Sequence, residues 1–280
     1  VLITGTAGFI GFHLAKLLLA KGIVVYGFDG MTDYYDVALK KRRHQMLLQN
    51  PNFAATEGML EDRALFERVA DEFEPDVIIH LAAQAGVRYS LENPRAYLDA
   101  NVIGTLNVME AARRLNVKHL LMASTSSVYG ANTKMPFIET EKADTQLTIY
   151  AATKKANESM GHAYAHLYNL PTTMFRFFTV YGPWGRPDMA LFRFTKAMLA
   201  GEKIQVFNYG KHRRDFTYVD DIVEGVIRVL DKPATASPNW QGEQPDPCTS
   251  DAPWRVYNIG NNKPEELLDY IRAIEIALKI

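Results

Sequence analysis

Three glycines near the start of the chain, Gly5, Gly8 and Gly11, follow a short apolar segment and are spaced three residues apart. In a strand–turn–helix unit the first glycine permits the tight turn, the second lets the backbone approach a phosphate, and the third lets the helix pack closely on the strand. The N-terminus of that helix faces the phosphate with its partial positive charge. This pattern predicts a Rossmann-like unit that binds a dinucleotide, with Phe9 and Ile10 also among the contacts.

An acidic residue strengthens this interpretation. Asp29 lies eighteen residues after Gly11, at the end of the second apolar segment. A carboxylate in that place accepts hydrogen bonds from the adenosine ribose hydroxyls and repels a 2′-phosphate. We therefore expect the cofactor to be NAD and not NADP.

Apolar segments typical of buried strands alternate with periodic segments typical of helices. Strands are predicted at residues 1–4, 23–28, 76–82, 118–123 and 172–178, and helices at residues 9–21, 61–73, 94–115 and 150–168. Such alternation indicates a doubly wound parallel sheet with helices on both faces, which binds ligands beyond the carboxyl ends of its strands. We expect an α/β fold with a Rossmann-like, NAD-binding domain over residues 1–182 that carries the catalytic residues.

Beyond residue 182 the elements become shorter and prolines more frequent. This change predicts a smaller C-terminal lobe over residues 183–280, with some of its chain returning to the sheet, and a long loop at residues 234–253. The chain opens inside its first predicted strand and stops inside a helical pattern, so we expect further residues at both ends.

The charge balance bears on partners and location. Lys and Arg total 31 against 32 for Asp and Glu, so no field favours nucleic acid or an anionic membrane. The one basic run, at residues 40–43, has no interleaved aromatic residues and is expected to be a solvated helix face. Cys248 is the only cysteine, so a reducing, cytoplasmic compartment is expected. No apolar run reaches the roughly 18 residues that a membrane-spanning helix needs.

The strongest chemical signal is a Tyr-x-x-x-Lys pair, Tyr150 and Lys154, on one face of a predicted helix. A free tyrosine has a pKa of about 10, so acting as a base near neutral pH needs a shift of roughly three units, or about 4 kcal/mol. A nearby ammonium group and a positive nicotinamide ring together can supply that shift. We expect Lys154 to bind the nicotinamide ribose and Thr125 to hold the hydroxyl that reacts. The alternative is an ordinary surface i,i+4 pair.

With these residues the chain resembles the extended short-chain dehydrogenase/reductase superfamily, which includes NAD-dependent nucleotide-sugar epimerases and dehydratases. The glycine spacing and the Tyr–Lys pair carry the resemblance, together with the segments at residues 80–84, 101–105, 176–183 and 214–221. The segments at residues 33–36, 85–90 and 185–190 are similar to those of the UDP-glucuronate 4-epimerases.

The resemblance implies where cofactor and substrate bind. Further cofactor contacts are expected at Leu60, Leu81, Ala82, Ala83, Gln84, Asn101, Ser124 and Phe177. Substrate contacts are expected at Arg88, Ser126, Ser127, Thr179, Arg186 and Arg214, and the C-terminal lobe is expected to hold the nucleotide sugar. The alternatives for these hydroxyls and arginines are caps and surface ion pairs. Two departures lie near the adenine position, where Gly30 replaces the usual asparagine and Met59 a common aspartate.

Position 127 decides which reaction the resemblance implies. Related dehydratases carry Asp-Glu after the threonine and UDP-glucuronate decarboxylases carry Ser-Glu, whereas this chain has Ser126 and Ser127. Without that acid, oxidation at C4 gives a ketone that is reduced again from its other face, with Tyr150 taking the hydroxyl proton. We expect a UDP-sugar epimerase that interconverts UDP-glucuronate and UDP-galacturonate, with both serines and Thr179 holding the carboxylate.

Rival functions remain open. An epimerase of UDP-glucose or UDP-N-acetylhexosamine would use the same catalytic residues without a carboxylate pocket, and a UDP-glucuronate decarboxylase would release carbon dioxide. A dehydrogenase would accumulate or consume NADH, and a non-enzymatic dinucleotide sensor would lack the Tyr–Lys pair. The resemblance also implies a homodimer formed by the helices at residues 94–115 and 150–168.

The histidines give no sign of metal chemistry. His162 and His166 lie four residues apart on a predicted helix but have no evident third ligand, so no metal site is predicted. His80 ends a buried strand and is expected to be a packed histidine and not a base.

Overall fold

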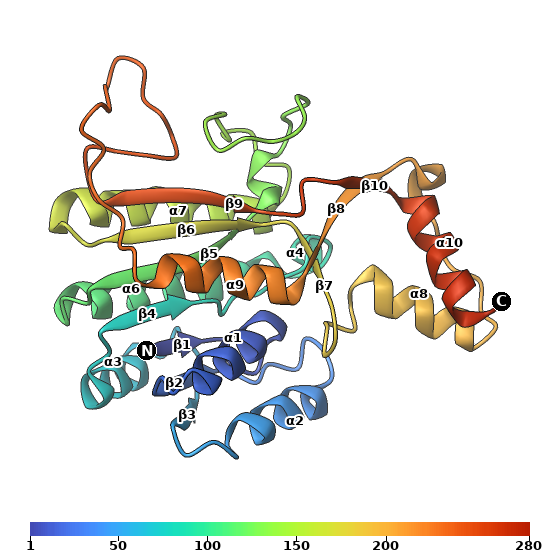
Figure 1. Cartoon of the computed structure of the whole chain (residues 1–280), viewed down its shortest axis with the longest axis horizontal. Helices are drawn as coiled ribbons and strands as arrows, with labels where there is room; N and C mark the ends of the chain where they lie inside the picture. Colours follow the sequence, from blue (N-terminus) through green and yellow to red (C-terminus); the bar gives the residue numbers. More distant parts are fainter.

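The structure, a computed structural model, describes residues 1–280 and is built around a parallel sheet of seven strands (Figure 1). The strand order is β3-β2-β1-β4-β5-β6-β9. The strands are β1 (Leu2–Thr4), β2 (Val25–Asp29), β3 (Phe53–Glu57), β4 (Val77–His80), β5 (His119–Thr125), β6 (Thr172–Phe177) and β9 (Trp254–Ile259). Because β1 pairs with both β2 and β4, the winding reverses there, and sheets of this kind bind ligands at that switch point.

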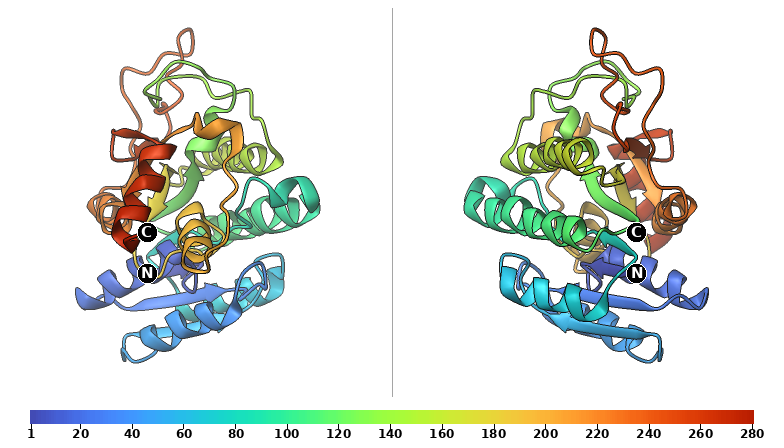
Figure 2. Two further views of the ribbon diagram at one scale, coloured as in Figure 1. Left: turned by 90° about the vertical axis from the view of Figure 1, so that its right-hand side faces the viewer. Right: turned by 90° about the vertical axis from the view of Figure 1, so that its left-hand side faces the viewer.

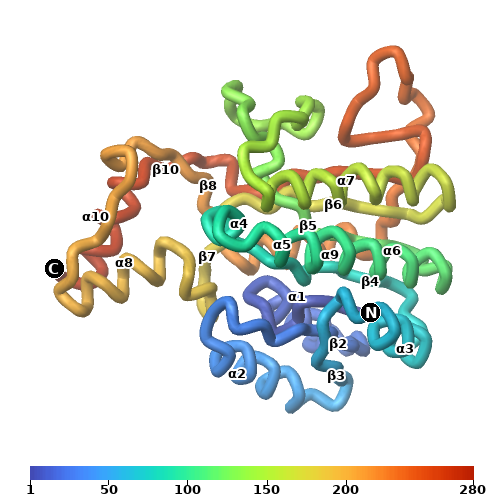
Figure 3. Tube along the Cα trace, turned by 180° about the vertical axis from the view of Figure 1, so that it is seen from behind, coloured from blue at the N-terminus to red at the C-terminus, as the bar shows by residue number.

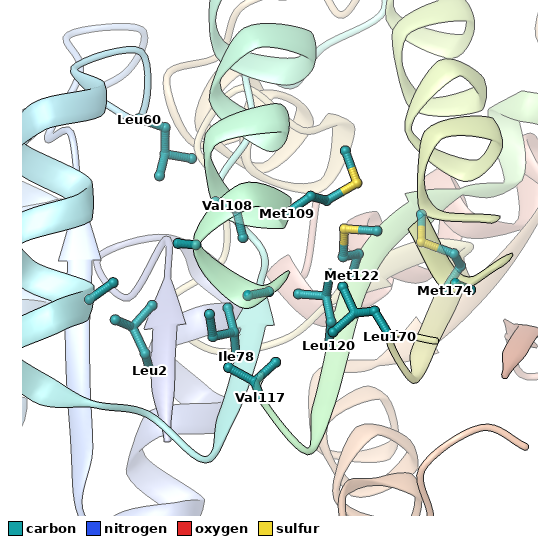
Figure 4. Packing of buried hydrophobic residues seen from close by; sticks show 14 of the residues in the cluster. Leu2, Leu60, Ile78, Val108, Met109, Val117, Leu120, Met122, Leu170 and Met174 are labelled. Atoms are coloured by element: carbon teal, nitrogen blue, oxygen red, sulfur yellow. The ribbon is translucent and has the colours of Figure 1, made fainter. Parts of the chain in front are cut away.

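Helices cover both faces of the sheet and bury two cores of similar size, with 20 and 19 residues. On one face lie α3 (Arg63–Phe73), α6 (Gly104–Arg114) and α7 (Ile149–Tyr168), and Figure 4 shows side chains of this core from β4, β5 and α6. On the other face lie α1 (Phe9–Ala20) and α9 (Val219–Leu230). The side views in Figure 2 show these two helix layers on opposite sides. The observed architecture is therefore the predicted doubly wound α/β fold.

All predicted strands and helices are present, with ends that shift by at most two residues. The helix predicted at residues 94–115 is a continuous run of α5 (Pro94–Tyr97), a π-helical segment η1 (Leu98–Ile103) and α6. The short α4 (Tyr89–Glu92), β3, β9 and α9 were not predicted, and α2 (Val37–Leu47) was expected only as a helix face at residues 40–43.

A smaller lobe projects from the carboxyl end of β6 (Figure 3). It contains β7 (Thr179–Tyr181), α8 (Ala190–Leu199), β8 (Arg213–Tyr218), β10 (Pro264–Glu266) and α10 (Leu267–Leu278). Its three strands form a sheet in the order β10-β8-β7. The helix α9 packs on the main sheet and β9 is one of its strands, so the chain passes between the main sheet and the smaller lobe more than once. The domain division at residue 182 therefore stays a proposal.

The long connection between α9 and β9 contains no helix or strand, as predicted for residues 234–253. It forms the extended loop at the top of Figure 1. None of the helices combines the length and apolar character that crossing a membrane requires.

The basic run on α2 corrects one expectation. Lys41 and Arg42 are exposed, but Lys40 and Arg43 are only 5% and 0% exposed, so the run is not simply a solvated face. Lys40 Nζ donates to the Thr32 hydroxyl (3.0 Å), and the Arg43 guanidinium donates to backbone carbonyls. Hydrogen-bond acceptors on neighbouring segments, which the local sequence does not reveal, make this burial possible.

The turn between β1 and α1 requires its glycines. Gly5 has a φ of +83°, and a Cβ there would lie 2.8 Å from the Ala82 nitrogen. A Cβ at Gly11 would lie 2.1 Å from the Gly5 oxygen, so the start of α1 lies directly against the turn. The three glycines therefore allow backbone contacts between β1, α1 and the end of β4 that side chains would block.

Gly5→Ala is expected to lower the free energy of unfolding more than Gly22→Ala. Both positions have positive φ, but nothing lies within 4 Å of a Cβ at Gly22. The left-handed conformation alone costs alanine about 1–2 kcal/mol, and the clash with Ala82 adds to that loss only at Gly5. Urea denaturation of both variants and the wild type measures the difference. Equal losses would contradict the importance of the close contact.

Candidate active site

The N-terminus of α1 has the properties that a dinucleotide pyrophosphate needs. Gly8 occupies the N-cap position and supplies no side-chain cap, so the first N–H groups of the helix, from Phe9 and Ile10 onward, have no side-chain acceptor. A phosphate can satisfy them and is attracted by the helix dipole. The three glycines, Phe9 and Ile10 are thus gathered at the switch point of the sheet.

Asp29 is held rigidly at the end of β2. Its carboxylate accepts hydrogen bonds from the backbone N–H groups of Ala7 (2.9 Å) and Met31 (2.9 Å). Each oxygen retains a further lone pair for a ribose hydroxyl. A Cβ at Gly30 would lie 2.5 Å from the Met59 sulfur, so the Met59 side chain fills the space beside the acid. Leu60, next in the chain, is buried and its carbonyl accepts from the amide of Asn107 (2.8 Å).

The loop after β4, with Leu81, Ala82, Ala83 and Gln84, is positioned by Asn101. The buried Asn101 amide accepts from Gln84 N (2.8 Å) and donates to Gln84 O (3.0 Å) and to the Thr153 hydroxyl on α7 (3.1 Å). Sequence reasoning placed Asn101 against the cofactor, whereas its amide here joins this loop to α7. The π-helical geometry of η1 places Asn101 for these contacts, and such segments are frequent at functional sites.

Tyr150, Lys154 and Glu158 lie on one face of α7, at successive spacings of four residues. Burial raises the pKa of Tyr150, while a hydrogen bond with Thr125 and the charge of Arg186 lower it. Lys154 is 2% exposed. Burial lowers its pKa to about 8, and only the charge of Glu158 opposes this effect.

The Lys154 side chain is 2% exposed, and Glu158 is the one opposite charge that acts on its ammonium group, which leaves donors free for a ligand. Ribose hydroxyls would satisfy such a group. The donor set of this site therefore fits NAD.

A buried network of hydrogen bonds holds the face of α7 that carries Tyr150 and Lys154. Glu158 accepts two hydrogen bonds from Arg176 on β6 (2.9 and 2.8 Å) and one from the Ser124 hydroxyl on β5 (2.6 Å). The Arg176 guanidinium lies over the Tyr129 ring, 4.8 Å from its centroid. Tyr129 in turn donates to Asn258 on β9 (2.8 Å). The roles of Glu158 and Tyr129 in this network could not be predicted from their residue types. For Glu158 the one signal in the sequence is its spacing of eight residues from Tyr150, which places both on one face of a helix.

The expected substrate hydroxyls gather at the end of β5 and the start of β7. Thr125 is the N-cap of the 3₁₀ turn at Ser126–Tyr129, and its hydroxyl accepts from Ser127 N (3.2 Å). Ser126, Ser127 and Thr179 are half-buried, and Phe177 is buried just before β7. Capping is therefore a real role for Thr125, alongside its contact with Tyr150.

The three expected substrate arginines differ in their surroundings. Arg186 donates to Asp188 (3.0 Å) and is close enough to Tyr150 for its charge to lower the pKa of that phenol. Arg88 lies over the Phe207 ring, 4.1 Å from its centroid, and so contacts the smaller lobe. Arg214 lies on β8, and its guanidinium donates to the Arg213 carbonyl. The structure places Arg186 close to Tyr150, whereas Arg88 and Arg214 lie toward the smaller lobe.

The histidines are structural. The buried His80 contacts the hydroxyls of Thr4 (2.7 Å) and Thr105 (2.9 Å), and burial lowers its pKa to about 3, so it is a packed, neutral histidine as expected. His162 Nε2 contacts the Ser250 hydroxyl (2.9 Å). No three His, Cys, Asp or Glu side chains converge as metal ligands would.

Lys154→Met is expected to stabilise the cofactor-free protein at pH 7. The folded-state pKa of about 8 lies below the ordinary value of 10.5, so between these pH values the unfolded state holds more protons and the wild type gains stability as the pH rises. The advantage of the variant should be on the order of 3 kcal/mol at pH 7 and should largely vanish near pH 10.5. Urea denaturation across this range, with Lys21→Met as an exposed control, measures it. A difference that does not change with pH would contradict the buried charge.

Comparison with known proteins agrees with this geometry. Residues 1–260 match the model of the NAD dependent epimerase/dehydratase family. A probable UDP-glucuronate 4-epimerase of Rhizobium meliloti is 56% identical over 278 residues, which cover 99% of this chain and 82% of that protein.

Two solved structures share the fold. The UDP-glucuronic acid 4-epimerase of Bacillus cereus, in complex with UDP-glucuronic acid and NAD, is similar with a TM-score of 0.86 and 32% identity over 100% of this chain and 83% of that one. The UDP-glucose 4-epimerase of Thermotoga maritima, with UDP-glucose, is similar with a TM-score of 0.80 and 28% identity over 98% and 81%. Family model, sequence identity and fold agree, and the chain belongs to the NAD-dependent epimerase/dehydratase family.

Proposed function

We propose that this chain is an NAD-dependent 4-epimerase that interconverts UDP-glucuronate and UDP-galacturonate. The observation that carries the proposal is the sequence Thr125-Ser126-Ser127 at the end of β5, next to Tyr150, with hydroxyls and no carboxylate after the threonine. An epimerase needs only to oxidise and reduce the same carbon, so it has no use for an acid that would act at C5 or C6. The 56% identity to a probable UDP-glucuronate 4-epimerase supports the same substrate.

In this proposal Tyr150 is the base and, in the return step, the acid. Its phenolate removes the proton of the C4 hydroxyl, and its phenol returns a proton to the C4 oxygen after the keto sugar has turned over. Thr125, in contact with Tyr150, holds the same hydroxyl. NAD, when bound, supplies the hydride acceptor at C4 and gives the hydride back to the opposite face, so no net oxidation occurs.

Lys154 supports Tyr150 from one turn away. As a buried ammonium with donors free for a ligand it would bind the nicotinamide ribose, and its positive charge would favour the phenolate over the phenol. In the cofactor-free protein the charge of Arg186 and the Thr125 hydroxyl are the groups that lower the pKa of Tyr150. The remaining shift that a neutral-pH base needs would come with the bound cofactor.

The C5 carboxylate is the second requirement. A sugar oxidised at C4 is a β-keto acid, which loses carbon dioxide readily. Hydroxyls of Ser126, Ser127 and Thr179 would hold the carboxylate in an orientation that disfavours this loss. Ser126 and Ser127 follow Thr125 at the end of β5, and Thr179 lies shortly after Phe177, the residue that pairs with Thr125.

Epimerisation of a neutral sugar is the alternative, and the similarity to the Thermotoga maritima UDP-glucose 4-epimerase favours it. That reaction would use the same catalytic residues but would leave the three hydroxyls without a charged partner. Substrate choice therefore separates the two functions.

Purified protein with UDP-glucuronate and no added cofactor is expected to form UDP-galacturonate, because NAD is regenerated in each cycle. The kcat/KM for UDP-glucose should be lower than that for UDP-glucuronate, because each donor left unsatisfied costs about 1–3 kcal/mol of transition-state stabilisation. Chromatography of the products distinguishes the proposed function from its alternatives. Equal use of UDP-glucose would assign a neutral-sugar epimerase, and a UDP-pentose as main product would assign a decarboxylase.

Tyr150→Phe is expected to lower kcat by about 10² or more, because the ring remains and the base is lost. The fold and NAD binding should survive the change. Tyr164→Phe, on the same helix and away from Lys154, is the matched control and should keep wild-type turnover. Near-normal activity of Tyr150→Phe would refute the mechanism.

We also propose that the protein forms a homodimer through α6 and α7. Leu98 and Ile103 on the helix that leads into α6, and Leu167 and Tyr168 on α7, are exposed apolar side chains that a partner could cover. Sedimentation showing only monomer at micromolar concentration would contradict this assembly.

A cytoplasmic location is likewise proposed from the single cysteine. The pKa of Cys248 is raised to about 12 by burial and by Asp246, as suits an unreactive thiol. Recovery of the native protein from the cell envelope would contradict it.

A further inference from the structure

Arg43 on α2 is a fully buried guanidinium, with 0% exposure. Its NH1 group donates to the Ala7 carbonyl (2.8 Å) and the Tyr35 hydroxyl (2.9 Å), and its NH2 group donates to the carbonyls of Trp184 (2.5 Å) and Gly185 (3.2 Å). All four acceptors are neutral. Arg176 pairs directly with a carboxylate, whereas the carboxylate nearest along the Arg43 network, Asp29, binds the N–H group of Ala7 and does not bind the guanidinium itself.

The acceptors belong to segments that are far apart in the sequence. Ala7 lies in the glycine turn that faces the dinucleotide, and Trp184 and Gly185 lie in the connection between β7 and α8. This connection, residues 183–189, carries Arg186. Arg43 is thus a bridge between the cofactor turn and the segment that brings Arg186 toward Tyr150.

The same connection is held by α1 and adopts a strained conformation. Trp184 has a φ of +58°, which is rare for a residue other than glycine. Its ring packs on Phe12, with centroids 6.0 Å apart, and His13 Nε2 contacts the Pro183 carbonyl (2.9 Å). A conformation of this kind persists only where its surroundings hold it, and Arg43 binds the Trp184 carbonyl directly.

The missing counter-charge indicates what stabilises this bridge. A buried cation without an anion is unfavourable, because its hydration is lost and no opposite charge replaces it. The uncapped N-terminus of α1, where the pyrophosphate of NAD would lie, follows Ala7 by one residue. Bound NAD would therefore stabilise Arg43 in its bridging position.

We propose that Arg43 is a positioning residue that couples occupation of the glycine turn by NAD to the placement of residues 183–189, and so of Arg186 beside Tyr150. The coupling itself requires only dinucleotide binding. Its effect on catalysis rests on the proposed epimerase function.

Hydrogen exchange tests the coupling without any turnover. In the wild type, saturating NAD is expected to slow amide exchange across residues 184–190 by about fivefold or more, as an ordinary coupling free energy implies. Arg43→Lys keeps the positive charge but cannot reach four acceptors, so NAD should still bind while this slowing is lost. Arg42→Lys, at the exposed neighbouring position, is the control and should behave as the wild type.

A pH profile provides the catalytic readout. The charge of Arg186 lowers the pKa of Tyr150, so loss of its placement raises that pKa, and the acid limb of kcat/KM should move to higher pH in Arg43→Lys but not in Arg42→Lys. The other titratable groups at Tyr150, namely Tyr97 with its ring 6.1 Å away and Lys154 on the same helix, are the same in both variants.

Full retention of the NAD-induced slowing in folded Arg43→Lys would overturn the proposal, as would its absence in the wild type. If Arg43→Lys does not fold, Arg43→Gln replaces it, because the shorter amide cannot donate to the Ala7 and Trp184 carbonyls at once, and undiminished slowing in that variant would overturn the proposal equally. A wild type that binds NAD and shows the slowing but does not epimerise UDP-glucuronate would refute the proposed function and leave the coupling standing.

Discussion

A buried ion pair between Glu158 on α7 and Arg176 on β6 holds the helix that carries Tyr150 and Lys154 against the sheet. The two side chains are 3% and 1% exposed. Removing either partner would leave a buried charge uncompensated, which costs about 3–5 kcal/mol. Because Tyr150 and Lys154 lie on the same face of α7 as Glu158, this pair fixes the rotation of the helix about its axis. The positions of both groups relative to the end of β5 follow from it.

Buried cations serve two different ends in this molecule. Arg176 is neutralised by a carboxylate and contributes to a rigid base for the site. Lys154 on α7 and Arg43, which binds Ala7 in the glycine turn, are also buried, but neither forms an ion pair. Such unpaired charges make the cofactor-free protein less stable than it could be. A ligand that satisfies these charges removes that cost when it binds. The lower stability of the cofactor-free protein therefore contributes to the affinity for the ligand.

Much of the fold follows from local patterns. The glycine turn, the alternation of apolar strands with amphipathic helices, and the spacing of Tyr150 and Lys154 are all visible in short stretches of sequence. The strand β3 was not predicted, and neither was the burial of basic side chains on α2. β3 is an edge strand with only its first residue buried, so it lacks the apolar run of a central strand. α2 is rich in basic residues, and its buried side includes Lys40 and Arg43, which a charge pattern assigns to solvent.

The sequence alone determined that Tyr150 and Lys154 share one face of a helix, because residues four apart on a helix lie on adjacent turns. The sequence also predicted that polar side chains at the strand ends, such as Asp29 and Thr125, lie along one edge of the sheet, since the carboxyl ends of parallel strands share that edge. Only the tertiary structure decided which charges are paired and which are left buried without a partner. Glu158 meets Arg176 across a helix–sheet interface, and Arg43 meets Trp184 from 141 positions away. A hydrogen bond between distant segments depends on where the whole fold places two atoms within about 3 Å, and no local pattern encodes that distance.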